Sequence, residues 1–393
     1  MKGHVRKRGN KWCFVIDVGR DALTGERIQK WFSGFNKKVD AERSMIAKIK
    51  EINDGCYVEE IEETVEEFMQ NWLLNKKNTV RPGTWKSYSW LINTHLTPHL
   101  GKLKVINLKP IHLNNLYNQK LASSISNNSI KKLHSLIKDA LDEGIGYGSL
   151  SKNVAKAVTP PRVKKVKFEV WNEDQLAFFL KHAKASRFYV AFELAVSTGM
   201  RIGEILGLRW KDIDLCNKKI SVRQAYTKAE SGYDFHEPKT ASGERSIALF
   251  ENTVSLLTDH QKAQELEKNL NSNFYDDHGL VIQTHIGTPV NPRNLSREYY
   301  KILSIIEKEN VKKKEQGEDF IELPRIRFHD LRHTHATILL KRGVHPKIVQ
   351  ERLGHSSISI TLDTYSHVLP GLQEAALKSL GQSILGETNK KDD

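Results

Sequence analysis

The chain has 393 residues, ordinary apolar content and a formal net charge of +14. This length allows two or three domains with sizeable cores, and the charge favours a folded protein with a polyanionic partner over a merely basic surface. No apolar run in the sequence is as long as a membrane span, and no apolar signal core follows the N-terminus, so we expect a cytoplasmic protein. The three cysteines lie far apart without a CxxC pair, which indicates neither a disulfide framework nor a zinc site.

The first fifty residues carry thirteen Lys and Arg against five Asp and Glu, so +8 of the net charge lies in this segment. Two β-rich runs, residues 12–18 and 28–35, flank a turn and predict a hairpin, and apolar residues at helical spacing predict a helix within 37–52. A small sheet backed by one helix can place its strands in a DNA groove. The candidate DNA contacts are Arg6, Lys7, Arg8, Lys11, Arg20, Arg27 and Lys30.

The aromatic residues of this segment leave two interpretations open. Beside the basic residues they can contact DNA, or they can form the core of the small domain, and we favour the core for most of them. These residues are Trp12, Phe14, Trp31 and Phe32.

Apolar residues at helical spacing continue from residue 61 to about residue 155 and predict a compact helical domain. Its apolar stripes include Val65, Phe68, Trp72 and Leu73, and later Ile130, Leu133, Ile137 and Leu141, while Pro82 takes a favourable first-turn position. Residues 156–170 carry two prolines and five Lys or Arg before Phe168, which predicts an extended basic linker with Lys164 and Lys165 as candidate DNA contacts. A new helix is expected after Asn172, with Gln175 completing a capping box.

The stretch HDLRHTHAT, residues 329–337, packs three histidines around one arginine. His329 and His333 have the i, i+4 spacing of a metal-binding pair, but Arg332 lies one turn from His329 on the same side of the helix. A permanent positive charge there disfavours a metal cation and suits a phosphate. Two interpretations without a functional site explain these nine residues about as well as a phosphate site does. The histidines can be polar residues at a helix N-terminus that take part in no reaction, or they can be a packed core cluster.

Three other stretches carry side chains of the same chemical kind. In STGMRIGEILGLRW, Gly199 permits a sharp turn, Arg201 begins an apolar-striped helix, and Glu204 lies one turn on, where it can hold the guanidinium. Lys239 is expected at a hairpin tip after the strand 218–227, where it can reach a neighbouring site or simply be solvated. His355 follows a helix, and Tyr365 comes ten residues later. The segment 307–324 is expected to be a charged, solvated loop.

Four stretches resemble the motifs of the tyrosine recombinase family in their order and separation. They are TGMRIGE, EPKT, HDLRHTHAT and LGHSSISITLDTY. The resemblance covers residues from about 60 to 385, and residues 1–58 resemble the arm-type DNA-binding domain of phage and conjugative-transposon integrases. It implies a multidomain, mainly α protein with a small β-sheet-plus-helix arm-binding domain (1–58), a helical core-binding domain (60–155), a basic linker (156–170), a mixed α/β catalytic domain (171–386) and a tail (387–393). SKNVAKAV departs from the family, which often has Asn-Pro there.

The resemblance also implies roles for single residues. Tyr365 would attack the scissile phosphate, giving a phosphotyrosyl link to the DNA 3′ end and a free 5′ hydroxyl. Arg201 and Arg332 would clamp the nonbridging oxygens, with Glu204 in support. Three further roles are implied, namely proton transfer at the tyrosine for His329, protonation of the leaving oxygen for Lys239 and donation to a phosphate oxygen for His355. Three histidines match no family role: His333 is expected to be a structural hydrogen-bonder, His335 partly buried, and His367 is unassigned.

The implied activity is site-specific integration and excision of a mobile element without a metal ion, ATP or other cofactor, because the covalent link preserves the phosphodiester energy. The implied partners are double-stranded DNA with core-type and arm-type sites and a homotetramer in the synapse, docked through residues 376–386. A DNA-bending accessory protein and an excision factor are further candidates; no membrane partner is expected, and the protein should associate with the nucleoid.

Other classes remain as alternatives. Chromosome-dimer resolution is disfavoured because that branch resembles a shorter chain without the arm module. A type IB topoisomerase would use similar chemistry, although the arm module and linker fit a recombinase better. A metal-dependent nuclease should show carboxylates beside the histidines, where only Asp330 is adjacent. A DNA-binding regulator with an inactive catalytic fold is opposed by the full set of catalytic residue types.

Overall fold

The computed structural model describes residues 3–20, 24–53, 62–163, 168–229, 232–238 and 243–365. The chain divides into two compact units, Met1–Lys165 and Val166–Asp393. Within the described ranges, no helix is long and apolar enough to span a membrane.

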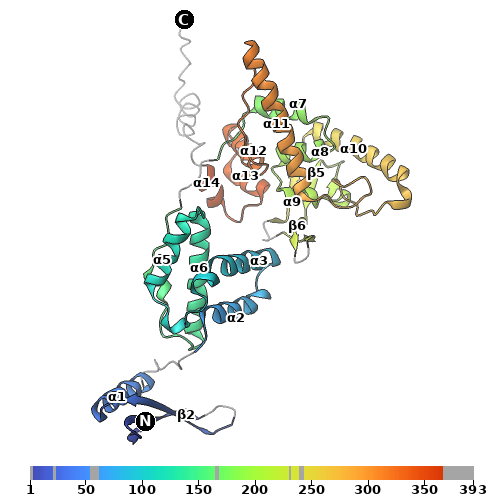
Figure 1. The fold of residues 1–393 in the computed structure, drawn as a ribbon. Coiled ribbons are helices and arrows are strands. Elements are labelled where there is room, and N and C mark those ends of the chain that lie inside the picture. Colours follow the sequence, from blue (N-terminus) through green and yellow to red (C-terminus); the bar gives the residue numbers. More distant parts are fainter. Residues whose placement is uncertain are drawn as a thin grey trace, which may run out of the picture. The chain divides into compact units, whose positions relative to one another are not determined.

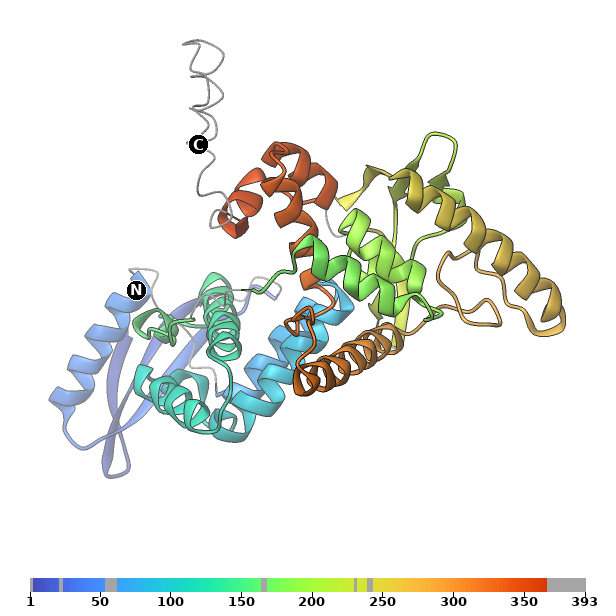
Figure 2. The ribbon, with the colours of Figure 1, turned by 90° about the horizontal axis from the view of Figure 1, so that it is seen from above.

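The N-terminal part is a three-stranded antiparallel sheet with one helix across it (Figures 1 and 2). The strands lie in the order β1 (Gly3–Arg8), β2 (Lys11–Arg20) and β3 (Arg27–Phe35), and α1 (Lys38–Asn53) follows. The predicted hairpin is confirmed as β2 and β3, and the predicted helix as α1. Strand β1 was missed because its sequence, GHVRKR, is too basic to show an apolar alternation. Phe14 and Ile16 pack against Ala41 of α1 in the small core.

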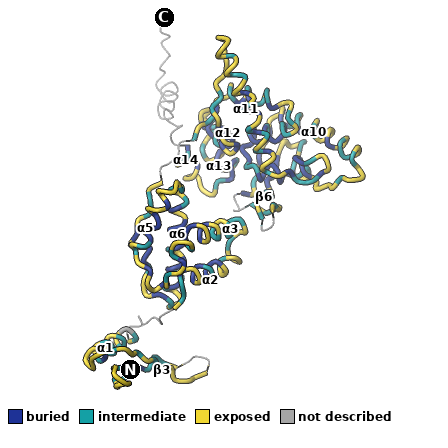
Figure 3. The backbone as a smooth tube through the Cα atoms, in the orientation of Figure 1, coloured by how far each residue is buried: buried dark blue, intermediate teal, exposed yellow. Residues whose placement is uncertain are grey.

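Residues 62–163 form a helical part, as predicted. Its helices are α2 (Val65–Lys77), α3 (Pro82–Leu91), α4 (Thr97–Leu100), α5 (Pro110–Ala122) and α6 (Asn127–Gly146), with short turns η1 (Ile92–Leu96), η2 (Val105–Asn107) and η3 (Val154–Ala157). Both predicted apolar stripes are buried in one core, visible as the dark positions of Figure 3. Thr64 caps α2 in a capping box with Glu67, and Pro82 is the first residue of α3.

The second unit surrounds the buried helix α8 with helices and two small antiparallel sheets. The helices are α7 (Glu173–Ala183), α8 (Tyr189–Thr198), α9 (Ile202–Leu206), α10 (Glu251–Leu270), α11 (Pro292–Gln316), α12 (Asp330–Lys341), α13 (Pro346–Leu353) and α14 (Ile358–Tyr365), with short turns η4 (Trp210–Asp212) and η6 (Ser272–Phe274). One sheet has the order β4 (Ile213–Asp214), β5 (Lys219–Val222) and β8 (Arg245–Ala248), and the other pairs β6 (Ala225–Ala229) with β7 (Gly232–His236).

Helix α8 is central because its sequence, YVAFELAVST, is apolar around most of its circumference, and it packs against α7, α9, α10 and α12. The predicted capping box at Asn172 and Gln175 is confirmed at the start of α7. The prediction of a loop for residues 307–324 is wrong up to Gln316, because α11 continues to that residue through strong helix formers. This end of α11 is mostly exposed (Figure 3), and Gly317, with φ of 71°, ends the helix.

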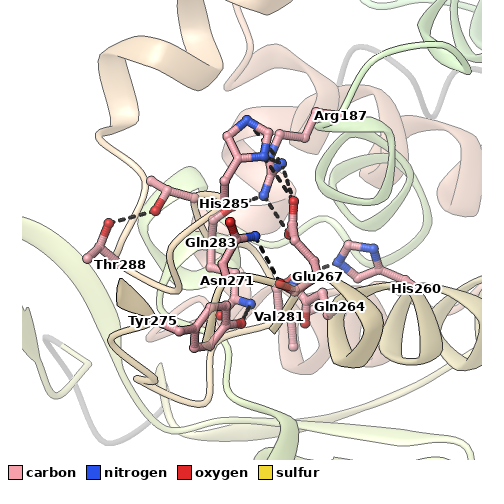
Figure 4. Close-up of polar contacts among 11 residues, drawn as sticks. Arg187, His260, Gln264, Glu267, Asn271, Tyr275, Val281, Gln283, His285 and Thr288 are labelled. Carbon is pink, nitrogen blue, oxygen red and sulfur yellow. Dashed lines mark hydrogen bonds and ion pairs between the residues drawn. The ribbon is translucent and has the colours of Figure 1, made fainter. Parts of the chain in front are cut away.

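A polar network fastens the segment after α10 to the body of the unit (Figure 4). Arg187 donates to both carboxylate oxygens of Glu267 at 2.8 and 3.0 Å and to the Gln283 carbonyl at 3.2 Å. The Arg187 hydrogen bonds lower the pKa of Glu267. Gln264 of α10 donates to the Val281 carbonyl at 2.7 Å, so two positions of the same segment are held by side chains.

Replacing the central carboxylate tests this account of the network. Glu267→Gln should lower the free energy of unfolding by about 1.5 to 3 kcal/mol, the usual contribution of hydrogen bonds to a charged group. Urea unfolding of the full chain measures the change. Glu265→Gln, at an exposed position of the same helix, is the matched control. Equal stability of the two variants would contradict the account.

Candidate active site

The turn between α8 and α9 presents Arg201. Gly199 ends α8 with φ of 68°, and a Cβ there would lie 2.8 Å from both His335 Cδ2 and Leu353 Cδ2, so both conformation and space require glycine. Arg201 is the N-cap of α9, where its Nη1 donates to Glu204 Oε1 at 2.7 Å and its backbone N–H donates to Oε2 at 2.9 Å. The predicted support of the guanidinium by Glu204 is therefore confirmed as a contact, and the Arg201 side chain remains 42% exposed.

Glu204 is shared with Arg245, a residue that the sequence analysis missed. Arg245 Nη2 donates to Glu204 Oε2 at 2.8 Å, and both side chains are 6% exposed. Burial alone would raise the pKa of Glu204, but the charge and hydrogen bonds of Arg245, followed by those of Arg201, outweigh it and lower the pKa to about 2. Glu204 is therefore a carboxylate at neutral pH and holds two arginines in place.

Arg332 is buried, at 3% exposure, and is held by backbone carbonyls. Its Nη1 donates to the Gly199 carbonyl at 2.9 Å and its Nη2 to the Leu353 carbonyl at 2.6 Å. Burial, followed by the neighbouring charge of Arg201, lowers the pKa of Arg332 to about 9, so the guanidinium is still charged at neutral pH. Two guanidinium groups that repel each other form a site that an anion stabilises.

Two of the histidine candidates of the site, His329 and His355, have lowered pKa values. His329, at the start of α12, is exposed, and partial desolvation, then the charges of Arg332 and Arg201, lower its pKa. His355 Nδ1 lies 2.9 Å from Thr361 Oγ1, and burial, followed by Arg332, lowers the pKa of His355 to about 4. Within the described residues, no cluster of three or more His, Cys, Asp or Glu side chains could hold a metal ion.

His335 is buried and fully hydrogen-bonded, rather than partly buried as expected. Its Nδ1 lies 2.8 Å from the Val196 carbonyl, and Arg352 Nε donates to its Nε2 at 3.0 Å. These partners fix the tautomer with the proton on Nδ1. Burial and Arg352 lower the pKa of His335 to about 3, so it is a neutral structural link between α12, α8 and α13.

Tyr365, the last residue of α14, is completely buried in a cluster of rings. Its hydroxyl lies 2.8 Å from His333 Nδ1, and the His333 ring stacks on Phe168 with centroids 4.3 Å apart. Burial raises the pKa of Tyr365 to about 12, although Arg332 opposes the rise. The expected hydrogen bond of His333 is therefore present, and its partner is the candidate nucleophile.

The structure brings five of the six candidate catalytic residues into one region. Electrostatic interactions link Arg332 with Arg201, His329, His355 and Tyr365. Lys239 lies outside the described residues, between β7 and β8. Arg245, His333 and Arg352 were missed as site residues because their contacts join segments distant in sequence, and no local motif records such contacts.

The basic candidates of the N-terminal sheet lie on different faces. Cross-strand pairing puts Arg6 opposite Cys13 and Val15 opposite Trp31, so these residues share the face away from α1. Arg6 lies over the Trp31 ring, 3.8 Å from its centroid, and Trp31 is 45% exposed. Of the aromatic residues, Phe14 is in the core as expected, while Trp31 is on the open basic face.

The remaining basic candidates also differ in the face of the sheet they occupy or in the partners they contact. By strand alternation Arg8 and Lys11 share the open face, and Lys7 points to the other one. Arg27 pairs with Asp17, and Arg20 donates to the Gly25 carbonyl at 3.4 Å. Lys30 is half-buried. Lys164 and Lys165 lie outside the described residues.

Comparison with known proteins identifies the family. The phage integrase family matches residues 169–371, the N-terminal SAM-like domain of phage integrases matches residues 64–121, and an arm DNA-binding domain matches residues 4–52. A "Tyrosine recombinase XerC-like" protein of Caldanaerobacter subterraneus subsp. tengcongensis is 30% identical, over 98% of this chain and 99% of its own length. The chain therefore belongs to the phage integrase family, and it is a tyrosine recombinase.

Further relatives agree with this assignment. The ICEBs1 integrase of Bacillus subtilis is 24% identical over 92% of this chain and 95% of its own length. Among solved structures, the Tn1549 transposon integrase in complex with transposon right end DNA has a TM-score of 0.67 at 22% identity, over 81% of this chain and 99% of that chain. A lambda integrase dimer bound to a COC′ core site has a TM-score of 0.53 at 18% identity, over 92% of this chain and 93% of that chain. These likenesses confirm the predicted fold class.

The low pKa of Glu204 predicts a pH dependence of stability. Because the folded-state pKa of about 2 lies below the ordinary value of 4.5, the carboxylate contributes stability that is fully present above pH 4.5 and is lost as the pH falls toward 2. Wild type should exceed Glu204→Gln by roughly 3 kcal/mol at pH 7, and by progressively less below pH 4.5. Urea unfolding across this range measures the difference, with exposed Glu66→Gln as control. A gap independent of pH would contradict it.

Proposed function

We propose that this chain integrates and excises a mobile DNA element by site-specific recombination through a 3′-phosphotyrosyl intermediate. The observation that carries the proposal is the convergence of two guanidinium groups, since Arg201 lies close enough to Arg332 to interact with it electrostatically, and Arg332 in turn interacts with Tyr365. One guanidinium is buried and fixed by carbonyls and the other is partly exposed and held by a carboxylate, so together they can receive a phosphate from solvent.

The proposed reaction needs no external energy source. Tyr365 Oη forms a bond to phosphorus while the bond from phosphorus to the 5′ oxygen breaks, and the reverse reaction with a new 5′ hydroxyl restores the phosphodiester. Arg201 and Arg332 stabilise the charge that grows on the nonbridging oxygens. His355 donates to one of these oxygens, and Lys239 gives a proton to the leaving oxygen. In this assignment the protein residues supply all the groups that the chemistry requires.

The proposed partners are double-stranded DNA sites of two kinds and further copies of the chain. The helical part and the catalytic unit would bind core-type sites, and the basic sheet would bind arm-type sites. The match of residues 4–52 to an arm DNA-binding domain and the likeness to a lambda integrase tetramer bound to a Holliday junction support this proposal. Residues 376–386, the expected docking segment, lie outside the described residues. A DNA-bending protein and an excision factor remain candidate partners in the nucleoid.

Chromosome-dimer resolution is the second candidate, because the relative at 30% identity carries the name XerC-like. The arm DNA-binding match favours integration, since a separate module for a second DNA site suits a reaction whose direction depends on that site. The two candidates differ in the DNA that is cut: the junction of a mobile element, or a single chromosomal locus.

A covalent trap tests the proposed function. Full-length protein is incubated in EDTA with nicked duplex DNA carrying the junction of the element that encodes it, and the DNA-linked peptide is identified by mass spectrometry. We expect an adduct at Tyr365 that Tyr365→Phe lacks. Arg332→Lys should slow adduct formation by at least about 10² to 10³, because lysine cannot reproduce the two-point contact.

The controls separate the alternatives. If DNA is cut without an adduct in a parallel reaction with Mg²⁺, and EDTA stops that cutting, the protein is a metal-dependent nuclease. Binding without cutting would favour a regulator. Cutting at a chromosomal locus instead of the element junction would favour dimer resolution.

The basic face of the N-terminal sheet predicts a salt dependence. If Arg6 contacts a phosphate, Arg6→Ala should weaken binding to arm-site DNA and reduce the slope of log affinity against log salt by about 1. Fluorescence anisotropy at several salt concentrations measures the slope. Arg43→Ala is the control, because Arg43 is an exposed basic residue on α1 rather than on the open face of the sheet. An unchanged slope in Arg6→Ala would remove Arg6 from the interface.

A further inference from the structure

The nearest group to the candidate nucleophile is a histidine without a family role. The Tyr365 hydroxyl lies 2.8 Å from His333 Nδ1, a distance at which a proton passes directly between the two atoms. His329, to which the resemblance assigns proton transfer, lies one helical turn earlier, and its ring meets that of His333 edge-on at 5.3 Å between centroids. Its side chain is exposed, whereas Tyr365 is completely buried.

The contact is held in a cluster of three rings, those of Phe168, His333 and Tyr365. The His333 ring lies nearly parallel to Phe168, at 17°, with centroids 4.3 Å apart. Phe168 meets Tyr365 edge-on, at 75° and 5.9 Å. Phe168 therefore restricts both rings of the hydrogen-bonded pair, and α12 and α14 carry that pair on fixed helical positions.

We propose that His333 accepts the proton of Tyr365 when the phenol oxygen attacks the phosphate. The inference rests on the proposed function, because it needs Tyr365 to be the nucleophile. The Tyr365 O–H bond breaks and its proton moves to Nδ1 of the Nε2–H tautomer, while the bond from Oη to phosphorus forms and the bond to the 5′ oxygen breaks. The leaving oxygen takes its proton from the acid, for which Lys239 is the candidate. In religation, His333 returns its proton to the phenol oxygen.

The surroundings of His333 leave it able to accept a proton once DNA is bound. Burial, followed by the neighbouring His329, lowers the pKa of His333 to about 4, so at neutral pH the ring is neutral and its Nδ1 can accept the Tyr365 hydrogen bond, while proton uptake is opposed in the absence of DNA. A DNA phosphate bound by the arginines adds negative charge nearby, which favours the imidazolium as the reaction proceeds. The ionisable groups that face the ring are Arg327, His329, Asp330 and Arg332 near the start of α12, His355 before α14, and Tyr365 of α14.

Two substitutions separate proton acceptance from positioning. His333→Asn puts an amide oxygen near the position of Nδ1, where it can accept the Tyr365 hydrogen bond but cannot take the proton. His333→Ala removes both functions and leaves space for free imidazole. Both variants should form the adduct with nicked junction DNA more slowly than wild type, by about 10² to 10⁴, the usual contribution of general base catalysis. Imidazole should restore at least about tenfold of this rate in His333→Ala and none in His333→Asn.

The measurements are single-turnover rates of adduct formation by the full-length protein, with thermal unfolding and DNA affinity recorded for every variant. His329→Ala is the matched control, and imidazole should not rescue it. Three results would overturn the inference alone: a His333→Asn rate within about threefold of wild type, rescue of His329→Ala in place of His333→Ala, or faster cleavage by His333→Ala, which would make His333 a latch on the buried tyrosine. If wild type forms no adduct, the proposed function fails and the inference fails with it.

Discussion

The burial of the Arg332 guanidinium is the constraint on which the catalytic unit depends. A charge removed from water is strongly unfavourable unless it is hydrogen-bonded, and here the partners are the Gly199 and Leu353 carbonyls. Both carbonyls lie at the C-terminal ends of helices, α8 and α13, where backbone acceptors are unpaired and the helix dipole is negative. One side chain therefore joins three helices, and the requirement for glycine at position 199 follows from the close packing around this junction.

Glu204 is the buried carboxylate that offsets part of the positive charge around Arg332. Arg201, Arg245 and Arg332 lie near one another, and Glu204 is the carboxylate that receives hydrogen bonds from two of them. Glu204 balances part of the positive charge, including that of Arg332, but it is the only carboxylate among the charges that act most strongly on Arg332 in the part of the chain that the structure describes, so the site keeps an excess of positive charge. A carboxylate hydrogen-bonded to both Arg201 and Arg332, the two guanidiniums proposed to bind the phosphate, would compete with that phosphate. The observed division lets the protein fold without DNA and still attract an anion.

Sequence reasoning predicted the parts of this site that are local. The link from Arg201 to Glu204 spans three residues of one helix start, so a capping pattern reveals it. Arg245 reaches Glu204 across 41 residues, and the contact of His333 with Tyr365 spans 32 residues. Such contacts depend on tertiary packing, which spacing along one helix does not encode. The resemblance assigns proton transfer to His329, and spacing alone could not show that His333, four residues later, contacts the Tyr365 hydroxyl.

Helix α14 positions two contacts of the site through its two buried residues. Thr361 and Tyr365 are its two buried residues and lie four residues apart, so they share one face. Thr361 contacts His355 at 2.9 Å, and Tyr365 contacts His333 at 2.8 Å, so each is paired with a histidine from another segment. A displacement of α14 would break both hydrogen bonds together. The position of the candidate nucleophile and that of His355 are therefore coupled through one turn of helix, because the spacing TLDTY puts both partners on one face and the tertiary packing brings a histidine to each.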